Sequence, residues 1–422
     1  MTDWRLRPNQ RLKQGSLRAS SRIIVLMLFG LGCGARPPRG LPEPRAGDRE
    51  GEHAGFISRL GVDTIVVESF SASRGVTEGD IIDRSPKTSW VHYAFTVDSG
   101  GRITSFTAAP RTVAAEAPAT PYWSVSVERV RGGFDVVDRE GDSTRRGFVP
   151  ASADAVPQWR AIALYELVTA RLRRAGGDSI ALPIIELDPP RVRESVIRRL
   201  GADSVVIPLV FPRGERARVD PTGRILGVSG MATSYKWLTE RVADLDVSAL
   251  ARSFSERDAR GAAFGSYSSR DTARAVIDGG HIAIDYGRPS KRGRVVFGGL
   301  VPWGEVWRTG ADLATHLTTD RDLRVGELLV PAGTYTLYTV PSPARWTLIV
   351  NRKTGQNGLL YDSAADLGRV DMTTKVLPRL TERLTITVEP ARAGGGALRI
   401  AWDNLMAEAL FNVVSRSAAH PH

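Results

Sequence analysis

Trp90-Val-His-Tyr-Ala-Phe-Thr-Val97 places apolar side chains at alternating positions, which is the period of a β-strand with one buried face. The same alternation appears in Arg102-Ile-Thr-Ser-Phe-Thr107 and in Tyr122-Trp-Ser-Val-Ser-Val-Glu128. Asp and Gly residues between the first two runs are typical of a tight turn, so these runs are expected to be neighbouring antiparallel strands. The sequence around residue 100 therefore predicts a β-sheet.

Two patterns from this region occur again about 130 residues further on. Ile57-Ser-Arg-Leu-Gly-Val-Asp-Thr-Ile-Val66 matches Ile197-Arg-Arg-Leu-Gly-Ala-Asp-Ser-Val-Val206, and Val97-Asp-Ser-Gly-Gly-Arg-Ile103 matches Val219-Asp-Pro-Thr-Gly-Arg-Ile225. The first pattern is a Gly/Asp turn that leads into a β-branched run, and the second is a hairpin turn. Because a solenoid needs three or more repeats, two copies predict two related half-sheets.

Helical signals lie between these halves. Pro157 stands at a plausible first helical position, Trp159 to Leu172 are strong helix formers, and Gly176-Gly177 end the run. Pro190 is expected to open a second helix, with one apolar face formed by Val192, Val196, Ile197 and Leu200. Residues 56–262 are thus predicted to form an antiparallel sheet in two halves with one or two packed helices.

The C-terminal part of the chain, residues 263–422, has the period of strands alone. Thr334-Tyr-Thr-Leu-Tyr-Thr-Val340, Leu384-Thr-Ile-Thr-Val388 and Leu398-Arg-Ile-Ala-Trp-Asp403 alternate with period two. Pro331-Ala-Gly333 is expected to be a hairpin turn that joins Leu328-Leu-Val330 to the first of these runs. Short strands separated by turn residues predict an antiparallel β-sandwich or barrel.

Longer motifs of this part carry a family resemblance over about residues 271–412. They include Ile282-Ala-Ile-Asp-Tyr-Gly-Arg-Pro-Ser-Lys-Arg-Gly-Arg294, Phe297-Gly-Gly-Leu-Val-Pro-Trp-Gly-Glu-Val-Trp-Arg-Thr-Gly-Ala311 and Val330-Pro-Ala-Gly-Thr-Tyr-Thr-Leu337. The region resembles the bacterial domain-of-unknown-function family 2911. It departs from the family at Asp312, where asparagine is usual, and at Asn357, where tryptophan is more usual. The resemblance implies a fold and an exported context, and no established activity.

The positive charge of the chain does not indicate nucleic-acid binding. The formal charge is +11, and the first 22 residues carry six basic side chains against one acid, which leaves +6 for the remainder. Runs of Lys and Arg interleaved with aromatic residues, as in proteins that bind a phosphate backbone, are missing from the sequence. We therefore expect no nucleic-acid partner.

The N-terminal residues 1–32 resemble a signal peptide. Ile23 to Gly32 form an apolar core of about ten residues behind the basic stretch, too short to span a membrane as a helix. Cys33, the only cysteine, follows at once and predicts lipidation, whereas the alternative is an ordinary secretory leader with an incidental cysteine. Residues 33–55 are rich in Pro, Gly and charge and are expected to form a tether. Gly34 favours sorting to the outer membrane, so the expected location is its periplasmic face or the cell surface.

No complete catalytic motif is present. The sequence lacks a Walker loop, G-x-G-x-x-G behind a strand, H-E-x-x-H and G-x-S-x-G, and its six histidines have no metal-ligand spacing. We predict no cofactor and no metal. Asp98, Gly101 and Arg102 are interpreted as hairpin-turn residues.

A polar cluster in the C-terminal part is the candidate ligand site, and its members are Arg288, Lys291, Trp307, Arg308, Thr309 and Asp312. The guanidinium fork of Arg308 beside loop N–H groups could hold a carboxylate, phosphate or sulfate. The alternative, which we favour from sequence, is that Arg308 pairs with Asp312 or Asp285 and fixes a loop. Nearby aromatic side chains are expected in the core, or lining a groove for a sugar or lipid chain.

Two functions remain open from the sequence. The first is a membrane-tethered, non-catalytic binding or envelope-maintenance protein with an apolar or anionic small ligand. The second is an envelope hydrolase of glycans or phosphate esters, with Asp285, Asp312 or Glu305 as acid and base and with Arg308 stabilising negative charge.

Overall fold

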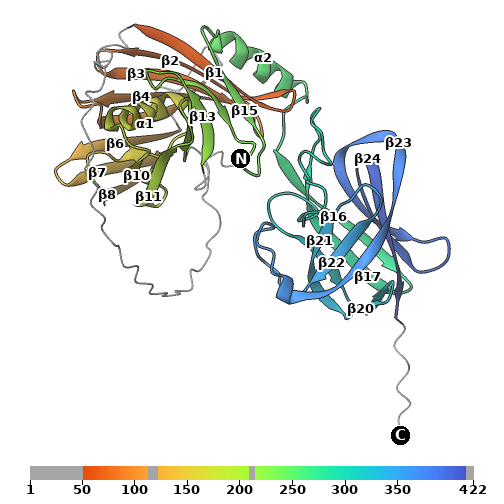
Figure 1. Cartoon of the computed structure of the whole chain (residues 1–422). Helices are drawn as coiled ribbons and strands as arrows, with labels where there is room; N and C mark the ends of the chain where they lie inside the picture. The colour runs from red at the N-terminus through yellow and green to blue at the C-terminus, as the bar shows by residue number, and fades with distance from the viewer. Residues whose placement is uncertain (1–50, 113–121, 209–213, 415–422) are drawn as a thin grey trace, which may run out of the picture.

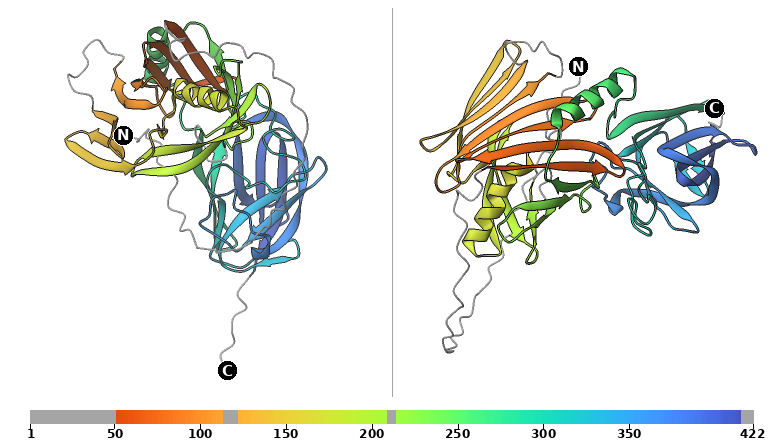
Figure 2. Two further views of the ribbon diagram at one scale, coloured as in Figure 1. Left: turned by 60° about the vertical axis from the view of Figure 1, so that its left-hand side comes forward. Right: turned by 90° about the horizontal axis from the view of Figure 1, so that it is seen from above.

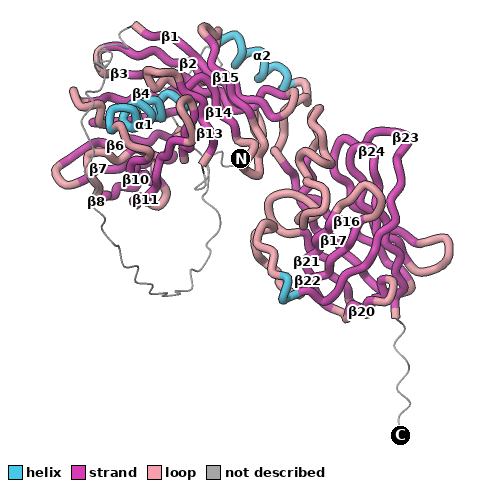
Figure 3. The backbone as a smooth tube through the Cα atoms, viewed as in Figure 1, coloured by secondary structure: helices cyan, strands magenta, loops and turns pink. Residues whose placement is uncertain are grey.

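The computed structural model describes residues 51–112, 122–208 and 214–414, and these residues are mostly β. Figures 1 and 3 show two bodies, an N-terminal sheet with two helices and a C-terminal body of strands. The predicted signal peptide, Cys33 and most of the predicted tether lie outside the described residues. None of the described helices is both long enough and apolar enough to cross a membrane.

The N-terminal sheet has fifteen strands in the order β8-β7-β6-β5-β4-β3-β2-β1-β15-β14-β13-β12-β11-β10-β9. The first half is a meander of eight strands: β1 Glu52–Leu60, β2 Asp63–Ser73, β3 Val76–Asp83, β4 Ser89–Val97, β5 Ile103–Arg111, β6 Trp123–Val130, β7 Gly133–Glu140 and β8 Ser143–Pro150. The second half contains β10 Ser179–Leu187, β11 Pro190–Arg199, β12 Ser204–Ile207, β13 Glu215–Val219, β14 Ile225–Ser229 and β15 Leu238–Val242, with β9 Val156–Pro157 parallel to β10. The two halves join where β1 pairs with β15, so the predicted two-half sheet is confirmed.

The predicted first helix is confirmed as α1, Ile162–Ala175, which ends at Gly176 in the left-handed conformation. The predicted second helix is wrong, because residues 190–199 form β11 and pair with β10 along its whole length. Val192 and Val196 are four residues apart, which suits a helix but also places both on one face of a strand. Ile197 points to the other face and is fully buried, whereas Val196 is exposed. The spacing of the apolar residues alone could not distinguish a helix from a strand.

A helix that the sequence interpretation missed, α2 (Val247–Ala259), packs on the face of the sheet opposite α1. Val67 on β2 contacts the α2 cluster, and its neighbour Glu68 points to α1, since successive strand residues face opposite sides. The sheet curves around α1 (Figure 2). Its two ends approach each other, since the guanidinium of Arg145 on β8 lies 3.7 Å from the carboxylate of Asp188 at the β10–β11 turn.

The C-terminal body is a sandwich-like antiparallel sheet of nine strands in the order β16-β17-β18-β21-β22-β23-β24-β19-β20. These strands are β16 Ser268–Ile277, β17 Gly280–Pro289, β18 Thr315–Thr319, β19 Leu323–Val325, β20 Leu328–Val330, β21 Gly333–Val340, β22 Trp346–Asn351, β23 Asp366–Pro390 and β24 Gly396–Val413, with a 3-10 turn at Ser363–Ala365. The register of β23 on β24 slips twice between Val376 and Thr385, where the long hairpin bends. The predicted sandwich is confirmed.

The predicted hairpin at Pro331-Ala-Gly333 is wrong. β20 pairs with β19 at one end of the sheet order, whereas β21 pairs with β18 and β22. The Pro331 carbonyl accepts a hydrogen bond from the Tyr335 hydroxyl (2.9 Å), and the Ala332 N–H donates to Asp322 (2.8 Å). The segment therefore joins two strands that lie apart in the sheet order. Its polar groups are satisfied by partners other than a facing strand.

The two bodies meet where the β1–β2 turn contacts the loop after β17. The Val62 N–H donates to the Arg292 carbonyl (3.1 Å), and the Arg292 guanidinium pairs with Asp63 (2.6 Å). The same guanidinium lies 4.0 Å from the ring centroid of Phe264, in the segment between α2 and β16. This contact uses the Gly-x-Asp turn of the first half-sheet, residues 61–63, which belongs to the internal repeat. It also gives a structural role to Arg292, one of the basic side chains between residues 288 and 294.

Candidate functional site

The structure disperses the basic members of the predicted ligand cluster. Arg288 donates to Asp271 (3.1 Å) and to the Leu384 carbonyl (3.0 Å), so it ties β17 to β16 and β23. Lys291 pairs with Asp403 at 2.5 Å across the same part of the sandwich. Both side chains thus hold strands together, and neither is brought to Arg308 by a described contact.

Residues 307–312 form a tightly held loop, and two of them adopt the left-handed backbone region. Thr309 has φ +54° and Asp312 has φ +61°. A β-branched residue at positive φ is an outlier that costs about 1–3 kcal/mol and persists only where its surroundings impose it. Aspartate and asparagine tolerate this region better than other residues with a side chain, so the backbone accepts the departure from the family at Asp312.

The packing of the loop explains how this conformation is imposed. Trp307 exchanges backbone hydrogen bonds with Thr339 (2.7 and 2.9 Å) and stacks on Trp402, with ring centroids 6.1 Å apart. Thr309 is fully buried, and its carbonyl accepts a hydrogen bond from the Thr315 hydroxyl (3.0 Å). A Cβ at Gly287 would lie 2.0 Å from the Ala311 carbonyl oxygen, so the loop rests directly on the backbone of β17. Arg308 and Asp312 therefore project from a rigid support.

Arg308 and Asp312 do not form the ion pair that we expected from sequence. Arg308 donates to the carbonyl oxygens of Gly310 (3.4 Å) and Asp312 (3.2 Å), and no carboxylate of the described chain lies within ion-pairing distance of its guanidinium. Asp285, the other expected partner, pairs with Arg270 at 2.6 Å. The fixed loop thus presents one cation and one anion that lack charged partners of their own.

The electrostatics of the pair reflect partial loss of water. Burial lowers the pKa of Arg308, against the opposing effect of Asp312, and burial raises the pKa of Asp312, against the effects of Arg308 and Arg270. Arg308 is half-buried, and Asp312 still reaches solvent. Each group would therefore gain from an opposite charge supplied by a ligand.

A tyrosine of the N-terminal body, Tyr235, is within electrostatic range of this pair. Tyr235 lies between β14 and β15 and packs edge-on against Tyr267, with centroids 5.4 Å apart. Burial is the main cause that raises the pKa of Tyr235; Asp312 raises it further, and Arg308 is among the groups that lower it.

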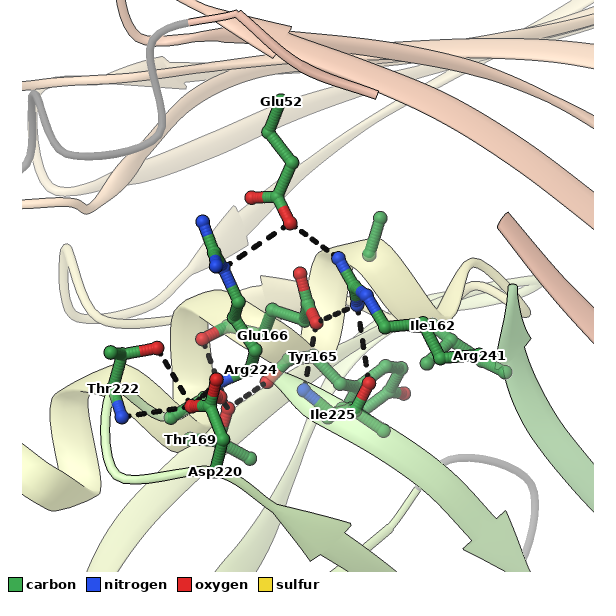
Figure 4. Close-up of polar contacts among 12 residues, drawn as sticks. Glu52, Ile162, Tyr165, Glu166, Thr169, Asp220, Thr222, Arg224, Ile225 and Arg241 are labelled. Carbon is green, nitrogen blue, oxygen red and sulfur yellow. Dashed lines mark hydrogen bonds and ion pairs between the residues drawn. The ribbon is translucent and has the colours of Figure 1, made fainter. Parts of the chain in front are cut away.

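A second polar cluster, the buried carboxylate network, consists of Glu52, Glu68, Glu166, Arg241 and Tyr93. Glu166 on α1 is fully buried and accepts hydrogen bonds from Arg241 (2.6 Å) and from the Ile225 N–H (2.8 Å), as Figure 4 shows. Arg241 on β15 also pairs with Glu52 on β1, at the junction of the two half-sheets. One guanidinium thus links the first strand, the last strand and the helix.

Glu68 binds the N-terminus of α1 from the other half-sheet. Its carboxylate accepts hydrogen bonds from the N–H groups of Ile162 (2.7 Å) and Ala163 (3.1 Å) and from the Tyr93 hydroxyl (2.6 Å). Burial raises the pKa of Glu68 to about 7; the three hydrogen bonds lower it, and Glu166 raises it. The network therefore contains a carboxyl group that exchanges its proton near neutral pH.

The two repeated hairpin turns hold the remainder of α1. Asp98 accepts hydrogen bonds from the N–H groups of Gly100 (2.9 Å) and Arg102 (3.0 Å), which agrees with the turn interpretation of these residues. The carbonyl of Gly101 in this turn accepts from Arg171 of α1 (3.2 Å). The matching turn at Asp220 has the same Asx geometry, and its Gly223 carbonyl accepts from Thr169 of α1 (2.5 Å). The internal repeat thus supplies one turn to each side of the helix.

The sequence interpretation missed the buried network, although a signal was present. Glu68 stands in the apolar strand segment 65–70, and Glu166 stands in the apolar helix segment 162–168. An acid within an apolar run is rarely buried unless it has partners. An acid within an apolar run could have indicated both glutamates. It could not have indicated Arg241, because its partners Glu52 and Glu166 lie 189 and 75 residues away in the sequence.

Comparisons with known proteins assign a family to part of the chain. Residues 268–411 match the model of the family described as "Protein of unknown function (DUF2911)". The predicted resemblance of the C-terminal domain is confirmed. No curated protein matches the chain. A solved structure, the crystal structure of a DUF1089 family protein from Pseudomonas aeruginosa, is similar at 16% identity and a TM-score of 0.28, over 40% of this chain and 92% of that one.

Within residues 51–112, 122–208 and 214–414, no group of three or more His, Cys, Asp or Glu side chains is placed to hold a metal ion.

Proposed function

We propose that the protein is exported, tethered to a membrane through Cys33, and that it binds a small ligand without transforming it. The observation that carries the binding role is the loop 307–312. It holds Arg308 and Asp312 on a strained backbone, without the ion pair that a purely structural arginine would make. Rigid presentation of partly desolvated charges lowers the entropy that a ligand loses on binding.

The arrangement favours binding over hydrolysis. A glycoside hydrolase needs two carboxyl groups about 5–9.5 Å apart, one of which gives up or takes a proton while the other stays charged. Asp285 is engaged by Arg270, and Glu305 is exposed two residues before Trp307. Burial raises the pKa of Asp312, and the charged groups that act on it, Arg308 and Arg270, are cations rather than a second acid.

The binding role can be tested with the small-molecule fraction of the cell that makes the protein. We expect this fraction, filtered to remove macromolecules, to raise the melting temperature of the full chain, since a ligand that binds only the folded state stabilises it by mass action. An unchanged melting temperature over a wide range of fraction concentration would remove the support for a ligand.

The tether can be tested separately by Cys33→Ser. We expect this variant to leave the membrane fraction and to melt at the wild-type temperature, because position 33 lies before the first strand of the folded part. The measurement is immunodetection of the two proteins after membrane sedimentation. A variant that still sediments with membranes would place the anchor elsewhere.

A further inference from the structure

Arg308 and Asp312 carry opposite charges on one short segment, and the Arg308 side chain is held against the backbone of Asp312. The Arg308 guanidinium reaches the backbone carbonyl of its neighbour Asp312 at 3.2 Å, so the cation lies beside the residue that carries the anion. Two of its five N–H donors are used by the carbonyls of Gly310 and Asp312, and those contacts are long. The contacts of Asp312 with Arg308 and with the Gly358 N–H are made by its backbone carbonyl, and among the described residues none forms an ion pair with its carboxylate.

Gly358 supports both residues of this pair. A Cβ at Gly358 would lie 2.6 Å from Cδ of Arg308, so the glycine makes room for the arginine stem. The Gly358 N–H donates to the Asp312 carbonyl at 3.4 Å, which is the same oxygen that Arg308 contacts. The stem of Arg308 and the backbone of Asp312 are thus fixed before a ligand arrives.

We propose that Arg308 and Asp312 bind the carboxylate and the ammonium group of a free α-amino acid. A guanidinium fork matches a carboxylate in two parallel hydrogen bonds. A neighbouring side-chain carboxylate is the natural acceptor for an ammonium group. An α-amino acid carries both groups on one carbon, so one small molecule neutralises both unpaired charges at once. This inference rests on the proposed binding function and names its ligand class.

A simple anion fits the loop less well. Phosphate, sulfate or acetate would satisfy Arg308 but would bring a second negative charge to Asp312, which repels it. A simple amine would satisfy Asp312 but would bring a second positive charge to Arg308, which repels it. The site therefore discriminates in favour of a zwitterion, and this discrimination is the measurable property.

The experiment is calorimetric titration of the full chain with each of the proteinogenic L-amino acids and its D-enantiomer, at up to about 10 mM, a range that detects dissociation constants near 1 mM. Acetate and methylamine serve as single-charge probes. We expect at least one amino acid to bind, and both single-charge probes to bind at least tenfold more weakly. No binding by any amino acid, or equal binding by acetate, would overturn the proposal.

Three variants show whether this pair is responsible. Asp312→Asn keeps a residue that tolerates positive φ and removes the charge, and Arg308→Lys keeps the charge and removes the planar fork. We expect each to weaken amino-acid binding at least tenfold. Arg345→Lys, at an exposed pair with Asp371 in the same domain, is the matched control and should bind as wild type does. Wild-type affinity in either loop variant would also overturn the proposal.

The result separates this inference from the proposed function. If the cell's small-molecule fraction raises the melting temperature and no amino acid binds, the binding function stands and the ligand class is wrong. If neither has an effect, both fail.

Discussion

Replacing Arg241 with methionine is expected to lower the free energy of unfolding of the N-terminal body by about 3–5 kcal/mol, the cost of removing one partner from a buried ion pair. Methionine fills much of the volume of the arginine side chain, whose guanidinium carbon lies 5.3 and 5.5 Å from the ring centroids of Phe56 and Phe70. The loss therefore comes from Glu166, which is fully buried and would lose its ion pair with Arg241. Urea-induced unfolding of the two proteins measures the difference.

A matched control lies on the same pair of strands. Arg59 on β1 pairs with Glu240 on β15 at 3.0 Å, but both side chains are exposed, so Arg59→Met should cost no more than about 1 kcal/mol. The double variant Arg241→Met/Glu166→Met should recover much of the loss, because it removes the stranded charge as well. If Arg241→Met unfolds at the same urea concentration as Arg59→Met, the network does not anchor α1.

The pH dependence of stability should carry the signature of Glu68. Its pKa is raised from 4.5 to about 7 in the folded protein, chiefly by burial. Between these two values the folded state keeps a proton that the unfolded state has released, so stability is greatest at acid pH and falls as pH rises. The fall attributable to Glu68 amounts to about 3 kcal/mol once the pH is above 7.

The measurement is the free energy of unfolding at intervals from pH 4.5 to 8 for the wild type and for Glu68→Gln. Other groups titrate in both proteins, so the difference between the two curves isolates Glu68. We expect this difference to change steadily across the window, with the variant losing less stability as pH rises. Two parallel curves would mean that the carboxyl group is ionised throughout, and that the hydrogen bonds from α1 and Tyr93 outweigh its burial.

The sequence predicted the β elements well, because alternation is a local property. The runs at 90–97, 102–107 and 122–128 became β4, β5 and β6, and the repeated hairpin turns have the same Asx geometry. The predicted helix at 190–200 and the predicted hairpin at 331–333 were wrong for a shared reason. In both segments the partner strand decides the structure, and a local pattern does not name the partner.

The candidate site was predicted as residues but not as an arrangement. From the sequence we expected Arg308 to pair with Asp312 or Asp285. The loop instead turns at Thr309 and Asp312, and Arg308 contacts the backbone carbonyl of Asp312 without an ion pair. Positive φ at a threonine follows from its contacts with Thr339 and Thr315, which are distant in sequence.

Arg308→Lys tests the central claim most directly, by two melting curves of the full chain, one without additions and one with the cell's small-molecule fraction. A ligand-binding arginine that makes only long contacts to carbonyl oxygens should contribute little to the empty protein. We therefore predict that the variant melts at the wild-type temperature without additions and that the fraction, which raises the wild-type melting temperature, has no effect on it. A variant that melts several degrees early without additions and responds to the fraction as wild type does would contradict the account, since Arg308 would then serve to clamp its loop.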